Sequence, residues 1–374
     1  MAEPQTLTFR CTPGPMADRG LFSGERLVLA RQRRGLFAQE LAARVGVSVK
    51  TVGRWERSEK APEAKNVLAL SALLDFPPNY FFGDAPERLA AEKFRALARL
   101  TRRDQSLARA AGAQAVALDR WISQRFTRPE PNVPDLRDCT PEEAAEKLRA
   151  VWALGNKPLP NIVHLLERNG VRVYSLVHLG DEIDAFSVWQ GAVPFVFLNT
   201  VKSTERGRMD ACHELCHLTM HAHTNGSAEE REAQTFAGSL LMPAVPFLAS
   251  RPARISLSAI IEAKQEWGVS ALAYAHRLYT LRHMTDWQYR NLCIEIKSKF
   301  PRTEPGPERP REHSQVLAKV FANGASRKDM ARDLGIRMQD FDEMTFGLAL
   351  TPISGGATSS VPHPTPPPNL RLVP

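Results

Sequence analysis

The chain has 374 residues, of which 24% are charged and 43% apolar, a composition that suits a globular protein of roughly two or three domains. It contains no run of 18 apolar residues and no apolar segment near its start, so we expect neither a membrane span nor a secretory signal. The net charge of +8 favours a polyanionic partner, and five scattered cysteines favour a reducing, cytoplasmic environment.

The N-terminal part predicts a small helical domain behind a flexible arm. Residues 1–22 contain proline and glycine without a hydrophobic period and form the arm. In residues 23–84 a first helix ends near Gly35, and a short second helix at 39–45 is broken by Gly46. Ser48 can cap a third helix at 49–57. This order of short helix, glycine turn and second helix is typical of the helix-turn-helix, and a closing helix is expected near residue 70.

Residues 23–84 resemble the Cro/CI-type (XRE) DNA-binding domain, through the runs Gln39–Ala42, Gly46–Ser48 and Trp55–Arg57. The resemblance implies a five-helix-type domain that binds double-stranded operator DNA, with a homodimer as the binding form. Residues 23–65 hold ten lysines and arginines against five acidic residues, although each basic residue alone is equally typical of ordinary surface. We expect base contacts from Gln39, Val49, Lys50 and Arg54, and phosphate contacts from Arg57 and Lys60.

The middle of the chain predicts a connection followed by a mixed domain. Residues 87–126 predict a helical linker, with a dimerisation surface or a DNA-backbone contact as alternatives. A hinge at 127–139 precedes a helix that Thr140 caps, with Glu143 completing a capping box. A helix at 162–168 and short strands at 171–177, 185–189 and 193–198 follow.

The sequence His213-Glu214-Leu215-Cys216-His217 predicts a metal site on a helix. Positions i and i+4 lie on one helical face, so both imidazoles can bind one zinc ion. Glu214 lies beside His213 and can act as the general base that accepts a proton from an activated water. The alternative is a surface helix with a chance pair of histidines.

A catalytic zinc needs a third protein ligand, and a second acidic helix follows the motif. Its apolar stripe includes Ala233, Phe236 and Leu240, and Glu230 lies on the same side as that stripe. Glu230 is therefore the expected third ligand, with Glu232 in reserve and a solvated helix face as the alternative for either acid.

These residues resemble the ImmA/IrrE family of metallopeptidases. The shared pattern is the His-Glu-x-x-His motif, then Glu230-x-x-Ala233-Gln234-x-Phe236-Ala237, then a leucine-rich segment that ends at Pro243. The resemblance spans residues 140–300 and implies a zincin-like domain that cleaves a repressor or antitoxin. It also implies that the strand at 193–198 is a sheet edge that binds substrate, with an ordinary core strand as the alternative. Three residues depart from the family pattern: Asp210, Cys216 and Gln234.

Other metal-binding side chains near the motif are weaker candidates. His221 is rotated by about 80° from His213 on a straight helix, a poor geometry for a third ligand. We expect His221 and His223 to be surface residues or to support the ligands. Cys212 and Cys216 flank the histidines, where they could compete for metal or sense oxidation, but small buried side chains are the expected role.

The C-terminal third predicts helices, a linker and a tail. Residues 255–299 are helical, and residues 302–311 are a proline-rich charged linker. Residues 312–348 form a small helical unit that looks like a second, degenerate helix-turn-helix, for which packing or a partner role is expected rather than DNA binding. Residues 351–374 are rich in proline and serine and are expected to be disordered.

Together these features predict a mainly α protein with a small β-sheet (α+β class) and two activities. The expected function is a cytoplasmic transcriptional regulator that also cleaves a protein partner with Zn²⁺. A second hypothesis is a DNA-binding regulator without catalysis, whose metal domain senses a signal or docks a partner. The ligand set would also accept manganese or iron.

Overall fold

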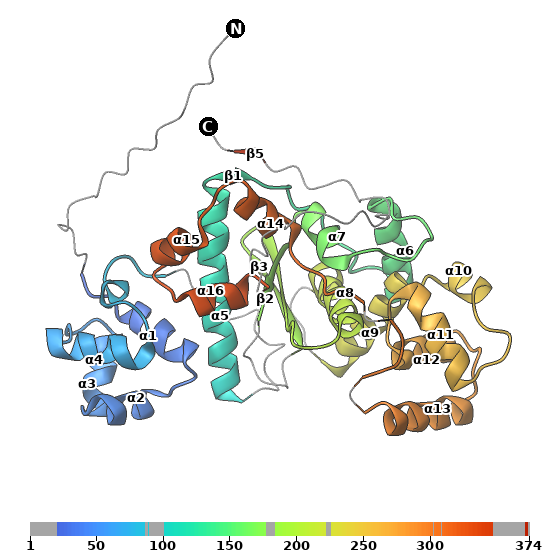
Figure 1. Cartoon of the computed structure of the whole chain (residues 1–374), viewed down its shortest axis with the longest axis horizontal. Helices are drawn as coiled ribbons and strands as arrows, with labels where there is room; N and C mark the ends of the chain where they lie inside the picture. The colour runs from blue at the N-terminus through green and yellow to red at the C-terminus, as the bar shows by residue number, and fades with distance from the viewer. Residues whose placement is uncertain are drawn as a thin grey trace, which may run out of the picture. The chain divides into compact units, whose positions relative to one another are not determined.

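A computed structural model of the chain describes residues 21–86, 89, 101–176, 184–221, 226–301, 303–307, 309–346 and 371–372. Within these ranges the chain is mostly helical with a small three-stranded sheet, which confirms the α+β class (Figure 1). The described residues form two compact units. The first unit contains residues 21–31 and 37–86. The second unit contains residues 32–36 and the described residues from 89 onward. No helix in these ranges is long and apolar enough to cross a membrane.

The first unit is a helix-turn-helix domain. The C-cap Gly46 has a φ of +76°, which favours glycine, and the hydroxyl of Ser48 accepts a hydrogen bond from the Thr51 backbone, as predicted. Val52 and Trp55 are buried, which confirms the inner face of the third helix. The helices are α1 (Gly24–Arg33), α2 (Ala38–Val45), α3 (Val49–Glu56), α4 (Ala64–Leu74) and the 3₁₀ helix η1 (Pro78–Phe81).

The predicted arm overlaps the helix-turn-helix domain at its inner end. Phe22 is buried and forms an isolated antiparallel bridge with Phe82, so it belongs to the domain. The two rings meet edge to face with centroids 6.1 Å apart. The rest of the arm, residues 1–20, lies outside the described residues.

The second unit is built around a mixed sheet with the order β2 (Arg172–Ser175), β4 (Val193–Leu198), β3 (Ala185–Gln190). Strand β4 pairs in parallel with β2 and antiparallel with β3. The predicted edge strand at 193–198 is therefore wrong, because both of its sides are hydrogen-bonded and an incoming peptide has no edge to join. Its almost continuous apolar sequence fits a central strand buried on both faces.

Helices cover both faces of this sheet. On one face, helix α5 (Arg102–Ser123) approaches so closely that a Cβ on Gly112 would lie 3.6 Å from the rings of Phe186 and Phe197. On the other face, helix α8 (Thr204–Met220) packs against β3 and β4. Figure 1 shows the strands between these two helices. The described part of the predicted linker, from residue 101 onward, is thus packed in the second unit, and residues 87–88 and 90–100 lie outside the described residues.

Helix α9 connects α8 to other helices of this unit. Helix α9 packs against α8, α6 and α12. Thr140 caps α6 and shares the predicted capping box with Glu143. The bounds are α6 (Pro141–Val151), α7 (Ile162–Arg168), α9 (Ser227–Leu241), α10 (Ala244–Ala249), α11 (Leu257–Trp267), α12 (Ala271–Thr280) and α13 (Asp286–Lys299).

The segment predicted as a linker at 302–311 is attached to the second unit. Glu304 bonds both the Lys264 ammonium and the Ala271 backbone nitrogen, each at 2.8 Å. Arg309 donates to the carbonyl of Gln265 at 2.8 Å. Residues 302 and 308 lie outside the described residues.

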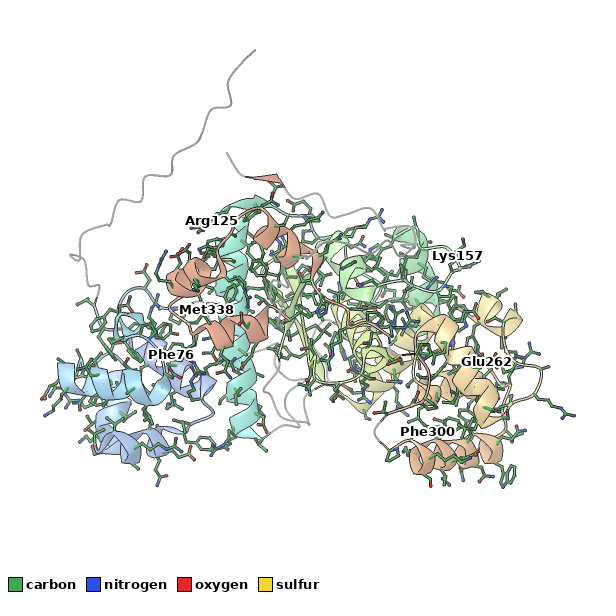
Figure 2. All side chains as sticks on the ribbon, in the orientation of Figure 1. Phe76, Arg125, Lys157, Glu262, Phe300 and Met338 are labelled. Carbon is green, nitrogen blue, oxygen red and sulfur yellow. The ribbon has the colours of Figure 1, made fainter. Side chains whose placement is uncertain are left out.

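The C-terminal helices complete the second unit. Helix α14 (Gln315–Ala322) packs on α7, α15 (Arg327–Leu334) packs on α5, and α16 (Met338–Met344) packs on β2. Helix α16 begins at Met338, labelled in Figure 2, and buries Asp340 and Phe341. It corresponds to the second helix of a helix-turn-helix, and this burial is consistent with a packing role.

The predicted disordered tail is described at two residues. Strand β5 (Arg371–Leu372) pairs antiparallel with β1 (Phe126–Thr127). The prediction of disorder is therefore wrong for these two residues, because backbone pairing does not require the apolar composition that the tail lacks. The other residues of the tail, 351–370 and 373–374, lie outside the described ranges.

Candidate metal centre and nucleic-acid interface

Helix α8 carries the His-Glu-x-x-His motif in its second half. Ser203 caps the helix by accepting a hydrogen bond from the Arg206 backbone at 3.3 Å, and the helix continues to Met220. One turn separates His213 and His217, so their rings stand on the same face with centroids 4.9 Å apart. The rest of this half is buried, which holds the helix rigidly against the sheet.

The three predicted ligands converge. Nε2 of His213 and Nε2 of His217 lie 3.1 Å apart, and the Glu230 carboxylate reaches them at 3.5 Å and 3.8 Å respectively. Glu230 comes from the first turn of α9, which packs along α8. Among the described histidines, cysteines and acidic residues, His213, His217 and Glu230 have ligand atoms close enough together to hold a metal ion.

The donor set fits zinc. Tetrahedral zinc with bonds of roughly 2.0–2.2 Å separates its ligand atoms by roughly 3.3–3.6 Å, close to the three distances observed here. Burial and the neighbouring His213 and His221 lower the pKa of His217 to about 3, so its ring is neutral, as a metal ligand requires. Two nitrogens and one carboxylate leave a fourth position open for water or substrate.

Glu214 is buried beside this cluster, with only 6% of its surface exposed. Burial raises the pKa of Glu214 to about 7, although the hydrogen bond from Ser187 opposes the shift. Oγ of Ser187, on β3, donates to Oε2 of Glu214 at 2.7 Å. A carboxyl group with a pKa near neutrality, held in a fixed position, suits a general base.

Glu232, the reserve ligand, lies elsewhere. Its Oε2 is 3.0 Å from Nε2 of His221, and Nδ1 of His221 is 2.9 Å from Nδ1 of His217. Both nitrogens of His221 are therefore engaged, and this residue supports a ligand rather than joining the cluster. His223 lies outside the described residues.

The two cysteines of α8 behave as buried apolar groups. Neither thiol is exposed, and Sγ of Cys216 contacts the sulfur of Met220 at 3.5 Å. Burial raises the pKa of the Cys212 thiol to about 12 and raises that of Cys216 as well. Both therefore remain protonated at neutral pH, which disfavours metal binding and oxidation.

Asp210, one of the departures from the family pattern, lies one turn before Glu214. Nε of Arg206 pairs with its Oδ1 at 3.1 Å, while Oδ2 is buried without a hydrogen bond. Burial raises the pKa of Asp210. Asp210 therefore places a buried carboxyl group one turn from Glu214, where the family pattern has a small hydroxyl residue.

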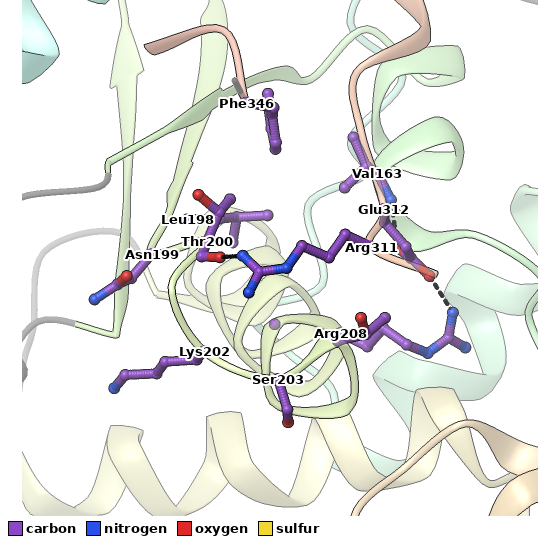
Figure 3. Close-up of a pocket in the computed structure, with 12 residues that line it drawn as sticks. Val163, Leu198, Asn199, Thr200, Lys202, Ser203, Arg208, Arg311, Glu312 and Phe346 are labelled. Atoms are coloured by element: carbon purple, nitrogen blue, oxygen red, sulfur yellow. Dashed lines mark hydrogen bonds and ion pairs between the residues drawn. The ribbon is translucent and has the colours of Figure 1, made fainter. Parts of the chain in front are cut away.

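A small pocket lies at the other end of α8 (Figure 3). The residues of α8 that line it, from Thr204 to Arg208, lie about 8–14 Å along the helix axis from His213, estimated from the rise per residue. Its charged side chains are already engaged: Arg208 pairs with Glu312, and Arg311 donates to the carbonyl of Thr200. The pocket is therefore separate from the candidate metal centre.

The six predicted DNA-contact residues are all exposed on the first unit. Lys50 and Arg54 project from α3 on the side away from Val52 and Trp55, and Val49 is exposed at the start of the helix. The other three are Gln39 near the start of α2, and Arg57 and Lys60 after α3.

An acidic residue interrupts this basic surface. The Arg57 guanidinium pairs with Glu59 at 2.6 Å, and Arg54 lies 3.8 Å from the same carboxylate. These side chains are 47–61% exposed, so solvent competes with both contacts.

Two families of known proteins match this chain. A helix-turn-helix profile matches residues 27–81, and a peptidase profile described as the IrrE N-terminal-like domain matches residues 166–279. The chain joins a helix-turn-helix domain to an IrrE N-terminal-like domain. The IrrE N-terminal-like domain contains all the residues of the candidate metal centre, which confirms the resemblance inferred from the sequence.

The helix-turn-helix domain also has a characterised relative. Repressor protein C2 of Salmonella phage P22 is 40% identical over 57 residues, which are 15% of this chain. The match covers 26% of the repressor, so the chain spans about a quarter of that protein's length. The similarity supports DNA binding in transcription regulation for the first unit.

The sequence did not reveal the role of Ser187 or the contact between His217 and His221. Alternation in β3 places Ser187 on the face opposite to Phe186, but the residue that it meets depends on how α8 crosses the sheet. The position of His221 follows from the end of α8, where its backbone leaves the helical conformation.

Proposed function

We propose that this chain is a DNA-binding regulator that also acts as a zinc-dependent endopeptidase on a protein partner. The observation that carries the proposal is the convergence of His213, His217 and Glu230, with Glu214 held beside them by Ser187. If the two histidines were a chance pair on a surface helix, a carboxylate from a second helix would not be expected at the same point.

The roles of the residues follow from their positions. His213, His217 and Glu230 would hold the zinc ion, which when bound supplies Lewis-acid activation of water and of a peptide carbonyl. Glu214 accepts the proton of the attacking water and then delivers it to the nitrogen of the leaving amine. Ser187 keeps the Glu214 carboxylate oriented toward the reacting groups.

The first unit would direct this activity to a regulatory site. We infer that α3 enters the major groove, with Val49, Lys50 and Arg54 facing base edges and Arg57 and Lys60 facing phosphates. A homodimer would place two such helices on the two halves of an operator. The peptidase substrate would then be a repressor or antitoxin that acts in the same circuit.

The test compares the wild-type protein with Glu214→Gln. Each would be loaded with zinc, assayed for metal content and incubated with repressor and antitoxin proteins encoded beside it, and new N-termini would be found by mass spectrometry. We expect one zinc per chain in both proteins and cleavage in the wild type alone. Zinc in both proteins with cleavage in neither would contradict the peptidase and favour a metal-dependent sensing or docking module.

A further inference from the structure

A continuous line of polar contacts leads away from the candidate metal centre. Nδ1 of His217 lies 2.9 Å from Nδ1 of His221, and Nε2 of His221 lies 3.0 Å from Oε2 of Glu232. The His221 side chain is 6% exposed, so its contact with His217 is sheltered from water, whereas the Glu232 side chain is 46% exposed and ends the line at the surface. Glu232 comes from α9, the same helix that supplies Glu230.

Hydrogen-bond chemistry fixes the direction of this line. An ionised carboxylate only accepts, so Nε2 of His221 must carry a proton and donate it to Glu232. In a neutral His221, Nδ1 then has a lone pair and must accept, so Nδ1 of His217 carries a proton and donates it. The lone pair of His217 is thereby placed on Nε2, the atom that faces His213 and Glu230.

We propose that His221 and Glu232 are positioning residues that set the tautomer and ring orientation of His217. The proposal rests on the proposed metal site and adds to it a support that the sequence pattern of the three ligands does not include. Partners of this kind orient a ligand ring and raise its basicity, and their loss typically weakens metal binding about 10- to 100-fold. Glu232, the second candidate for the third ligand, is thereby assigned to support His217 through His221 instead.

The first test measures zinc affinity by competition with a chromogenic chelator on the full-length protein. We expect His221→Ala and Glu232→Ala to bind zinc about 10- to 100-fold more weakly than the wild type. Glu262→Ala is the control, because it removes an exposed acid of α11 that takes no part in these contacts, and it should bind within about threefold of the wild type. Thermal unfolding of each variant checks that its fold is retained.

Two further variants separate this role from the alternatives. Glu230→Ala removes a proposed ligand and should lose more affinity than Glu232→Ala, whereas the reverse order would make Glu232 the ligand and overturn the proposal. Glu232→Gln keeps a hydrogen-bond acceptor and should lose less than Glu232→Ala. Equal losses of zinc affinity in Glu232→Gln and Glu232→Ala would assign the effect to the charge of Glu232 alone. That result would also overturn the positioning role.

The second test reads the tautomer directly in the metal-free protein. With ¹⁵N-labelled histidine rings, NMR should show His217 protonated at Nδ1 in the wild type and in Glu262→Ala. In His221→Ala the proton should move toward Nε2, a change that a merely structural residue would not cause. An unchanged tautomer together with wild-type zinc affinity would refute the positioning role. If the wild type itself bound no zinc, the proposed metal site would fail as well.

Discussion

Oγ of Ser187 donates a 2.7 Å hydrogen bond to Oε2 of Glu214, and this contact joins the outer strand β3 to the metal-site helix. It fixes the buried carboxyl group of Glu214, which lies beside the converging ligands. The sheet therefore contributes to the proposed chemistry by orienting the base, although it supplies no ligand.

Replacing Ser187 tests the value of this contact. Ser187→Ala should lower kcat/KM for the cleaved partner about 10-fold or more, because a hydrogen bond to a charged group contributes about 1.5–3 kcal/mol. Ser187→Thr retains the hydroxyl and is the matched control. Zinc content should be unchanged in both variants, and full activity in Ser187→Ala would show that Glu214 needs no such support.

Arg54 offers the sharpest test of the DNA-binding surface. Arg54→Ala should weaken binding to a DNA site selected by the wild-type protein by about 10- to 100-fold, because a bidentate arginine–guanine contact contributes about 1–3 kcal/mol. Fluorescence anisotropy at fixed salt would measure the change. Lys297→Ala removes an exposed positive charge from α13 and should leave binding unchanged. Equal effects of the two substitutions would contradict a specific contact.

Glu59 should act in the opposite direction. Its carboxylate pairs with Arg57 and lies near Arg54, so Glu59→Gln would release both guanidinium groups and remove a negative charge that repels phosphates. We expect tighter DNA binding and a steeper fall in affinity with salt, by about one unit of the logarithmic slope. Weaker binding in this variant would indicate that Glu59 holds Arg57 in its binding position.

Glu167 predicts a dependence of stability on pH. Its carboxyl group accepts hydrogen bonds from the backbone nitrogens of Gln315 and Val316 and from Ser314, and burial raises its pKa from 4.5 to about 7. Because the folded state holds this proton more tightly than the unfolded state, the stabilisation is fully present below pH 4.5. It is lost as the pH rises through 7.

The measurement is urea unfolding of the wild type and Glu167→Gln. Between pH 5 and pH 8 the free energy of unfolding of the wild type should fall by about 2–3 kcal/mol relative to the variant. Glu262→Gln, which changes an exposed carboxyl group labelled in Figure 2, serves as the control and should follow the wild type. Parallel curves for the wild type and Glu167→Gln would refute the shift.

Local patterns in the sequence predicted much of this structure. Ser48 and Gly46 mark the turn of the first unit, and the capping box of Thr140 and Glu143 marks the start of α6, because caps depend on neighbouring residues. The helical spacing of His213 and His217 likewise sets their shared face. The position of Glu230 could be inferred because the apolar stripe of α9 defines its inner side.

Relationships between distant segments could not be predicted in this way. The apolar run at 193–198 is compatible with an edge or a central strand, and only its partners β2 and β3 decide between them. The contacts of Ser187 with Glu214 and of His221 with Glu232 join different elements. They depend on helix crossing and on the end of α8, which hydrophobic periodicity does not specify.

The most direct test of the metal centre is X-ray absorption at the zinc edge on the zinc-loaded, full-length protein. The account predicts a first shell of nitrogen and oxygen at about 2.0–2.2 Å, with the outer-shell scattering of two imidazole rings. Sulfur at about 2.3 Å would place Cys212 or Cys216 in the shell, and a protein that takes up no zinc would have no such site. Either result would contradict a centre formed by His213, His217 and Glu230.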